Sequence, residues 1–151
     1  MNLKGVSFAD QFLPALLCLE IPLKTILAQF DTDPLPSTFD QVAAIDAGVE
    51  QLFSYGSVSP DNVTGLVHGM IFTRGPADLK NSAIFVGGSD VAAGEALFRK
   101  VSKTFFGPMR VSIMLDSNGC NTTAAAAIAS ARRHLKLAGC RAIVLGSTGP
   151  V

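Results

Sequence analysis

The chain has 151 residues, and its 12 lysine and arginine residues are balanced by 12 aspartate and glutamate residues. The length fits one domain of ordinary size, and a hydrophobic content of 48% excludes an intrinsically disordered chain. A formal net charge of zero gives no electrostatic reason to bind nucleic acid or an anionic membrane, so we expect neither as a partner.

The cysteines and histidines lack the spacing of a metal site or a disulfide framework. Cys18, Cys120 and Cys140 form no Cys-x-x-Cys pair, and their number is odd. His68 and His134 are far apart in sequence, so we assign both to structural roles. The sequence therefore predicts no metal site and a reducing, cytoplasmic location.

Residues 1–23 are interpreted as an uncertain N-terminal extension. Asp10 and Glu20 interrupt its apolar residues, which leaves a run too short to span a bilayer. A short amphipathic helix is one interpretation of this segment.

The first half of the remaining chain alternates between apolar runs and helical patterns. Residues 25–30 form a short apolar run that is typical of a buried strand. Ser37, with Asp40 three residues later, resembles a capping box, which predicts that a helix starts there. Residues 52–55 are expected to form a second strand.

The middle of the chain continues the alternation. Pro60 favours the start of a brief helix that ends near residue 68, and residues 70–73 are expected to be extended. Residues 82–86 predict a strong strand. The segment 87–90 then turns the chain into an amphipathic helix.

The last third of the chain gives four more expected elements. Residues 110–115 form a strand, residues 116–121 a loop rich in turn formers, and residues 122–137 an alanine-rich helix. Residues 142–145 are expected to form a final buried strand.

This alternation predicts the α/β class, with a parallel sheet and helices on both of its faces in three layers. Ligands of such sheets bind at the carboxyl ends of the strands. The rule selects the loops that follow Phe30, Val86, Leu115 and Leu145, where most of the unusual polar and glycine residues lie.

Several stretches, in order from about Lys24 to the end of the chain, resemble the family of NAD(P)-dependent methylene-tetrahydromethanopterin dehydrogenases. They are Gln29-Phe-Asp-Thr-Asp33, Pro36-Ser-Thr-Phe-Asp40, Phe72-Thr-Arg-Gly-Pro76, Ala83-Ile-Phe-Val-Gly-Gly-Ser-Asp90, Phe105-Phe-Gly-Pro108, Leu115-Asp-Ser-Asn-Gly119, Asn121-Thr-Thr-Ala124 and Leu145-Gly-Ser-Thr-Gly-Pro-Val151. One such motif is weakly informative, whereas several in the same order are specific.

The resemblance implies a cytoplasmic, homo-oligomeric two-domain oxidoreductase of one-carbon metabolism. It implies that residues 24–138 form a pterin-binding α/β domain and that residues 139–151 begin a truncated Rossmann domain for NAD or NADP. The enzyme would transfer a hydride from methylene-tetrahydromethanopterin, or methylene-tetrahydrofolate, to the nicotinamide. The small-molecule pterin would lie in the cleft between the two domains.

The phosphate loop departs from the family pattern Gly-x-Gly-x-x-Gly. Ser147 stands at the first glycine position and Gly149 at the second, and the chain stops before the third. The cofactor-binding residues that remain are Ser147, Thr148, Gly149 and Pro150. The chain alone is therefore expected to be inactive, and the alternative is a non-catalytic pterin-binding or oligomerisation module.

Hydride loss from the methylene bridge leaves an amidinium cation, so the site needs negative charge more than an acid–base pair. Asp31, Asp33 and Asp116 are the candidate carboxylates for this task, with Asp90 as a fourth. Asp90 could instead cap the following helix, and Asp116 could be the Asx residue of its turn.

The candidate substrate-binding residues follow the same strands. Phe39 stacks on the pterin or belongs to the core, and Gly87 and Gly88 allow close approach of a ligand or simply form a turn. Polar contacts to the pterin are expected from Ser89, Asp90, Ser117, Asn118, Asn121, Thr122 and Thr123. Because Asn121 or Thr122 must also cap the following helix, at least one of these two has a structural role. Arg74 binds an acidic tail of the cofactor, contacts a neighbouring subunit or is simply solvated.

Overall fold

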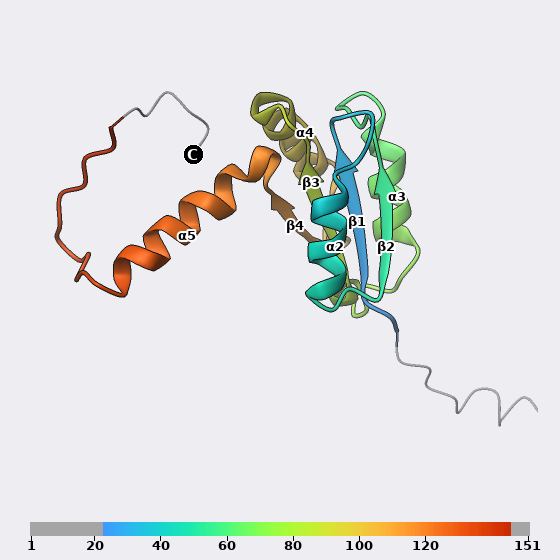
Figure 1. The fold of residues 1–151 in the computed structure, drawn as a ribbon. Helices are drawn as coiled ribbons and strands as arrows, with labels where there is room; N and C mark the ends of the chain where they lie inside the picture. The colour runs from blue at the N-terminus through green and yellow to red at the C-terminus, as the bar shows by residue number, and fades with distance from the viewer. Residues whose placement is uncertain (1–22, 146–151) are drawn as a thin grey trace, which may run out of the picture.

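The computed structural model describes residues 23–145 as an α/β domain with a projecting C-terminal helix (Figure 1). The predicted extension up to residue 22 and the phosphate-loop residues 147–150 lie outside this range. The elements, in chain order, are β1 (Ile26–Asp31), α2 (Thr38–Asp46), β2 (Gln51–Tyr55), α3 (Val63–Phe72), η1 (Leu79–Asn81), β3 (Ser82–Gly87), α4 (Val91–Thr104), β4 (Ser112–Leu115), η2 (Ser117–Gly119) and α5 (Cys120–Arg132).

The four strands form one parallel sheet in the order β2-β1-β3-β4. Phe30 of β1 is in register with Tyr55 of β2 and Val86 of β3, and Val86 pairs in turn with Leu115 of β4. The last residues of the four strands therefore meet at a single edge of the sheet. The predicted α/β class with a parallel sheet is confirmed.

One face of the sheet carries the packed core. Ala28, Phe30, Ile84 and Val86 alternate with residues of the opposite face along β1 and β3, and all four are fully buried. Helices α3 and α4 cover this face with Val63, Val67, Ile71, Leu97 and Val101, which are also fully buried. This core supplies most of the apolar burial in the described part of the chain.

Among the described residues, the opposite face is covered by α2 alone (Figure 1), and α2 contains no buried residue. The helix forms because Ser37 caps it: its hydroxyl accepts a hydrogen bond from the N–H of Asp40 at 3.3 Å. The reciprocal bond of a capping box is absent, since the N–H of Ser37 donates to Asp31 at 3.0 Å. The side chain of Asp40 is therefore not used in capping.

Helix α3 differs from its predicted position. It begins at Val63, three residues after Pro60, and continues to Phe72, so the expectation of an extended segment over 70–73 is wrong. Val67 and Ile71 are spaced by one helical turn and are both fully buried in the core. This packing stabilises the helix past Gly69, where propensity alone predicts an end.

Helix α5 begins two residues earlier and ends five residues earlier than predicted, and it buries only Cys120. It extends away from the sheet (Figure 1). Residues 142–145 do not form the expected strand, and the side chain of Leu145 is 89% exposed. An apolar run becomes a strand only beside a strand that can pair with it, and none lies next to it in residues 23–145. Within that range no helix combines the length and apolarity needed to cross a membrane.

Candidate functional site

Three loops from different strands meet at the carboxyl edge of the sheet. The N–H and the hydroxyl of Ser89 both donate to the carboxylate of Asp33, each at 2.9 Å. The N–H of Asn118 donates to the carbonyl oxygen of Gly88 at 2.8 Å. The loops after β1, β3 and β4 are thus joined by direct hydrogen bonds, as the carboxyl-end rule requires.

These loops enclose a polar cleft with a volume of about 510 Å³. It is lined by eight of the predicted site residues, namely Asp33, Phe39, Gly88, Ser89, Asp116, Asn118, Thr122 and Thr123. Gly87, Asp90, Ser117, Asn121 and Asp31 lie at the same edge of the sheet but do not line the cleft. We call this feature the rim cleft.

Asp31 organises the loop between β1 and α2. Its side chain is 1% exposed, and its two carboxylate oxygens accept hydrogen bonds from the N–H groups of Asp33 at 2.9 Å and Ser37 at 3.0 Å. The side-chain amide of Gln29 lies 3.4 Å from the second oxygen. The buried charge is therefore satisfied by the chain itself.

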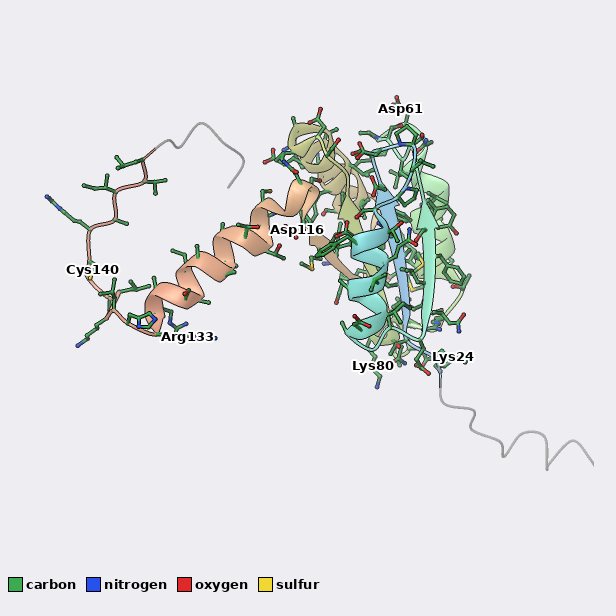
Figure 2. The ribbon with its side chains drawn as sticks, in the orientation of Figure 1. Lys24, Asp61, Lys80, Asp116, Arg133 and Cys140 are labelled. Atoms are coloured by element: carbon green, nitrogen blue, oxygen red, sulfur yellow. The ribbon has the colours of Figure 1, made fainter. Side chains whose placement is uncertain are left out.

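Asp116 lies where β4 leads into α5, at the edge of the sheet opposite Lys24 and Lys80 (Figure 2). One of its carboxylate oxygens accepts hydrogen bonds from the N–H groups of Asn121 and Thr122, each at 2.9 Å, and the Thr122 hydroxyl donates to the other. A carboxylate at a helix N-terminus also complements the helix dipole. Its contacts match the turn and capping alternative, although the side chain also lines the rim cleft.

Asp90 caps α4. Its carboxylate accepts a hydrogen bond from the N–H of Ala93 at 3.0 Å, and its side chain does not line the rim cleft. The capping alternative accounts for its position.

Gly88 is required by the contact between two loops. Its φ angle is +113°, and a Cβ atom at this position would lie 1.9 Å from the hydroxyl oxygen of Thr32 and 3.1 Å from its backbone nitrogen. Gly94 has a similar role that the sequence did not reveal, because a Cβ there would lie 1.9 Å from the hydroxyl oxygen of Ser117. Ser117 is fully buried by this close approach of α4.

Phe39 stands free of the core, with 82% of its side chain exposed. The core alternative for this residue is therefore wrong. The ring lies in the wall of the rim cleft, where it is free to stack on a flat ligand.

Asp40 also lines the rim cleft, although the sequence indicated only a capping role for it. Partial burial raises the pKa of its carboxyl group, and the negative charges of Asp31 and Asp116 act in the same direction, while a hydrogen bond with Ser37 opposes them. The signal available in the sequence is an acid in the first turn of a helix that starts at the ligand-binding edge.

A second cavity of about 370 Å³ adjoins the rim cleft on the α2 face of the sheet. Its walls are mostly apolar and include Leu27, Ala43, Phe85 and Met114. The two spaces share four lining residues, Phe39, Asp40, Asp116 and Thr122. We call this second space the apolar cavity.

Arg74 takes no part in either space. Its guanidinium donates to the carbonyl oxygens of Asn81 at 3.1 Å and Lys24 at 2.9 Å and to the hydroxyl of Ser82 at 3.1 Å. It therefore fastens the start of β1 and β3, and this structural role accounts for it without a cofactor tail. Among the described residues, no group of histidine, cysteine and acidic side chains could hold a metal ion.

A parallel sheet with a polar cleft at its carboxyl edge defines an α/β domain of the small-molecule-binding class. Residues 38–118 match the family model described as "Methylene-tetrahydromethanopterin dehydrogenase, N-terminal". The chain belongs to the methylene-tetrahydromethanopterin dehydrogenase family, a family of enzymes, and it matches that family's N-terminal domain.

Two relatives from Methylorubrum extorquens agree with this assignment. The "Bifunctional protein MdtA" is 53% identical over 127 residues, which cover 83% of this chain and 44% of the relative. The "NAD(P)-dependent methylenetetrahydromethanopterin dehydrogenase" is 35% identical over 121 residues, which cover 76% of this chain and 41% of the relative. The chain thus aligns with less than half the length of either relative.

Proposed function

We propose that this domain binds the pterin carrier of a methylene-tetrahydromethanopterin dehydrogenase in the rim cleft and the apolar cavity. The observation that carries the proposal is the junction of a polar and an apolar space at the carboxyl edge of the sheet. A reduced pterin needs both environments, since its ring has polar edges and apolar faces. Volumes of about 510 and 370 Å³ fall in the range of small-molecule sites.

The proposed reaction moves one hydride, with its two electrons, from the methylene bridge of the carrier to C4 of a nicotinamide. The carrier becomes a methenyl cation, and no proton is released. The task of this domain is to hold the ring in place and to supply negative charge near the new cation. Asp33 and Asp116 supply it from the wall of the rim cleft, and Asp31 adds its charge from behind the loop.

The proposed polar contacts to the carrier come from Ser89, Asn118, Thr122 and Thr123, which line the rim cleft. Behind these side chains, the loops are held in place by Gly87, Asp90, Ser117 and Asn121. Ser117 donates to the carbonyl oxygen of Gly87 at 3.4 Å, and the side-chain amide of Asn121 donates to that of Leu115 at 2.8 Å. These residues hold the loops that the carrier would contact.

The nicotinamide nucleotide, NADP or NAD, would supply the hydride acceptor. Residues 23–145 contain no Gly-x-Gly-x-x-Gly sequence, and the proposed phosphate-loop residues Ser147, Thr148, Gly149 and Pro150 lie outside the described range. We therefore infer that this chain alone binds the carrier but does not turn over. We further propose that the enzyme is a cytoplasmic homo-oligomer and that its carrier is tetrahydromethanopterin or tetrahydrofolate.

Calorimetric titration tests this function directly. Tetrahydromethanopterin, and separately tetrahydrofolate, is titrated into the chain, and the methylene form is then assayed for NADP reduction. We expect heat of binding and a raised melting temperature, but no reduction of NADP. If neither carrier produces heat of binding or a thermal shift, the proposal is rejected. NADP reduction would reject only the claim that the chain alone is inactive.

A further inference from the structure

Besides Asp90, which caps α4, four carboxylates come to the carboxyl edge of the sheet, and three of them have partners for both oxygens within the described residues. Asp31 accepts two N–H groups of its own loop, and Asp33 accepts the N–H and hydroxyl of Ser89. Asp116 accepts two N–H groups and a hydroxyl at the start of α5. In each case both carboxylate oxygens have partners, so none of these side chains is free to bind a ligand edge-on.

Asp40 is the exception among the four. Within residues 23–145 no N–H group donates to its carboxylate, and the Ser37 hydroxyl is the only neighbour that stabilises its charged form besides solvent. Its position is nevertheless well defined, because its backbone N–H is held in the first turn of α2. A Cβ atom on Gly87 would lie 3.7 Å from one of its carboxylate oxygens, which places that oxygen close to the end of β3.

The carboxylate also stands at the junction of the two spaces. Asp40 lines both the rim cleft and the apolar cavity, together with Phe39, Asp116 and Thr122. A flat ring that reaches from the polar space into the apolar one must therefore pass this side chain. A carboxylate there that accepts no N–H group of the described residues favours a ligand with N–H donors on its edge.

We propose that Asp40 is a positioning residue that binds the N–H edge of the carrier's aminopyrimidinone ring. The inference rests on the proposed function, because it names the contact that would orient the carrier in the same site. The ring presents its N3–H and its 2-amino group side by side, and a carboxylate accepts such a pair through two parallel hydrogen bonds. Asp40 can do so without leaving a backbone donor of the loops unpaired.

The carboxylate must be ionised to accept both hydrogen bonds. Asp31 from β1 and Asp116 from the end of β4 face it with negative charge, and the Ser37 hydroxyl faces it from the start of α2. Its raised pKa means that binding should weaken on acidification at a higher pH than for an ordinary aspartate. Replacement by asparagine should remove this pH dependence.

The test compares tetrahydromethanopterin with its derivative in which an oxo group replaces the 2-amino group. Both are titrated calorimetrically into the unchanged chain, Asp40→Asn and the matched control Asp46→Asn, which alters an exposed acid in the last turn of the same helix. We expect the unchanged chain and the control to bind the amino form 10-fold to 100-fold more tightly, the range expected for hydrogen bonds to a charged group. Asp40→Asn should lose that preference.

The possible results distinguish the inference about Asp40 from the proposed function. If the unchanged chain binds the amino form but Asp40→Asn keeps the preference, the inference is overturned and the proposed function stands. If the unchanged chain binds neither form, both fall. Should Asp40→Asn fail to fold, Asp40→Glu, which keeps the carboxylate, should keep the preference for the amino form. An Asp40→Glu variant with an intact circular dichroism spectrum that binds both forms equally overturns the inference. Equal binding of both forms by the unchanged chain again overturns the inference.

Discussion

The two faces of the sheet differ in packing and polarity. The face under α3 and α4 consists of fully buried apolar side chains, whereas the face under α2 carries the buried polar pair Gln29 and Asp31 and borders the apolar cavity. The first face maximises apolar burial, which stabilises the fold. The second face carries these polar groups and leaves a cavity beside them, which lowers stability but allows a ligand to bind. Substitutions on the first face should therefore change stability, and substitutions on the second face should change ligand binding.

The largest expected effect is a difference in unfolding free energy between variants of two phenylalanines, one on each face of the sheet. Phe30→Ala removes a fully buried ring from the packed face and should cost about 3–5 kcal/mol of the free energy of unfolding. Phe39→Ala, on the binding face, removes an 82% exposed ring and should change that free energy by less than about 0.5 kcal/mol.

Urea denaturation measures both variants, and titration with tetrahydromethanopterin measures binding. The comparison between the faces predicts weaker binding for Phe39→Ala despite its unchanged stability. Similar stability losses in the two variants would show that the faces are not energetically distinct.

A second prediction compares the loss of stability caused by alanine at two glycines with positive φ angles. Gly88→Ala combines backbone strain with a collision at Thr32 and should cost on the order of 3 kcal/mol of unfolding free energy. Gly48→Ala introduces the same kind of strain at φ +95°, but no atom lies within 4 Å of the added Cβ, so it should cost about 1 kcal/mol. Denaturation curves compare the pair, and equal costs would mean that the loop contact at Gly88 is unimportant.

The fold was largely predictable where local pattern and tertiary context agree. Strands β1 and β3 are apolar runs followed by turn residues, and the sheet buries both as that pattern predicts. The end of α3 was not predictable, because packing of Ile71 in the core outweighs the low helix propensity of Gly69. The strand predicted over residues 142–145 is wrong for the opposite reason. Its residues are apolar, but no neighbouring strand pairs with them in the described part of the chain.

The candidate site was predictable by location but not by role. Parallel topology brings together the three loops that the sequence selected, and Asp33 and Ser89 meet as a result. The sequence does not show which carboxylate satisfies buried N–H groups and which remains available. Asp31 and Asp40 are both acids near the same strand end, and only the hydrogen bonds separate them.

A smaller effect concerns the cap of α4, which borders the rim cleft. Asp90→Ala removes the hydrogen bond to the N–H of Ala93 and should cost about 1 kcal/mol of unfolding free energy. Glu95→Ala on the same helix breaks only the exposed ion pair with Arg99 and should cost about 0.5 kcal/mol or less. Thermal denaturation at low ionic strength measures both, and the reverse order of costs would contradict the capping role.

The smallest expected effect is a dependence of stability on pH. Because the pKa of Asp40 is raised in the folded state, its ionisation opposes folding at every pH above that pKa. Asp40→Asn should therefore raise the melting temperature slightly at pH 7. The difference should vanish below pH 3.8, the ordinary pKa of an aspartate, where the carboxyl group is protonated in both states. A lower melting temperature for Asp40→Asn at pH 7 would show that the carboxylate stabilises the fold.

Hydrogen exchange with and without tetrahydromethanopterin tests the central claim most directly, because it reports on both faces of the sheet at once. Binding at the carboxyl edge predicts slower amide exchange in residues 32–40, 87–90 and 116–123, with no local change in α3. Protection confined to α3, or spread evenly over the whole chain, would contradict the account.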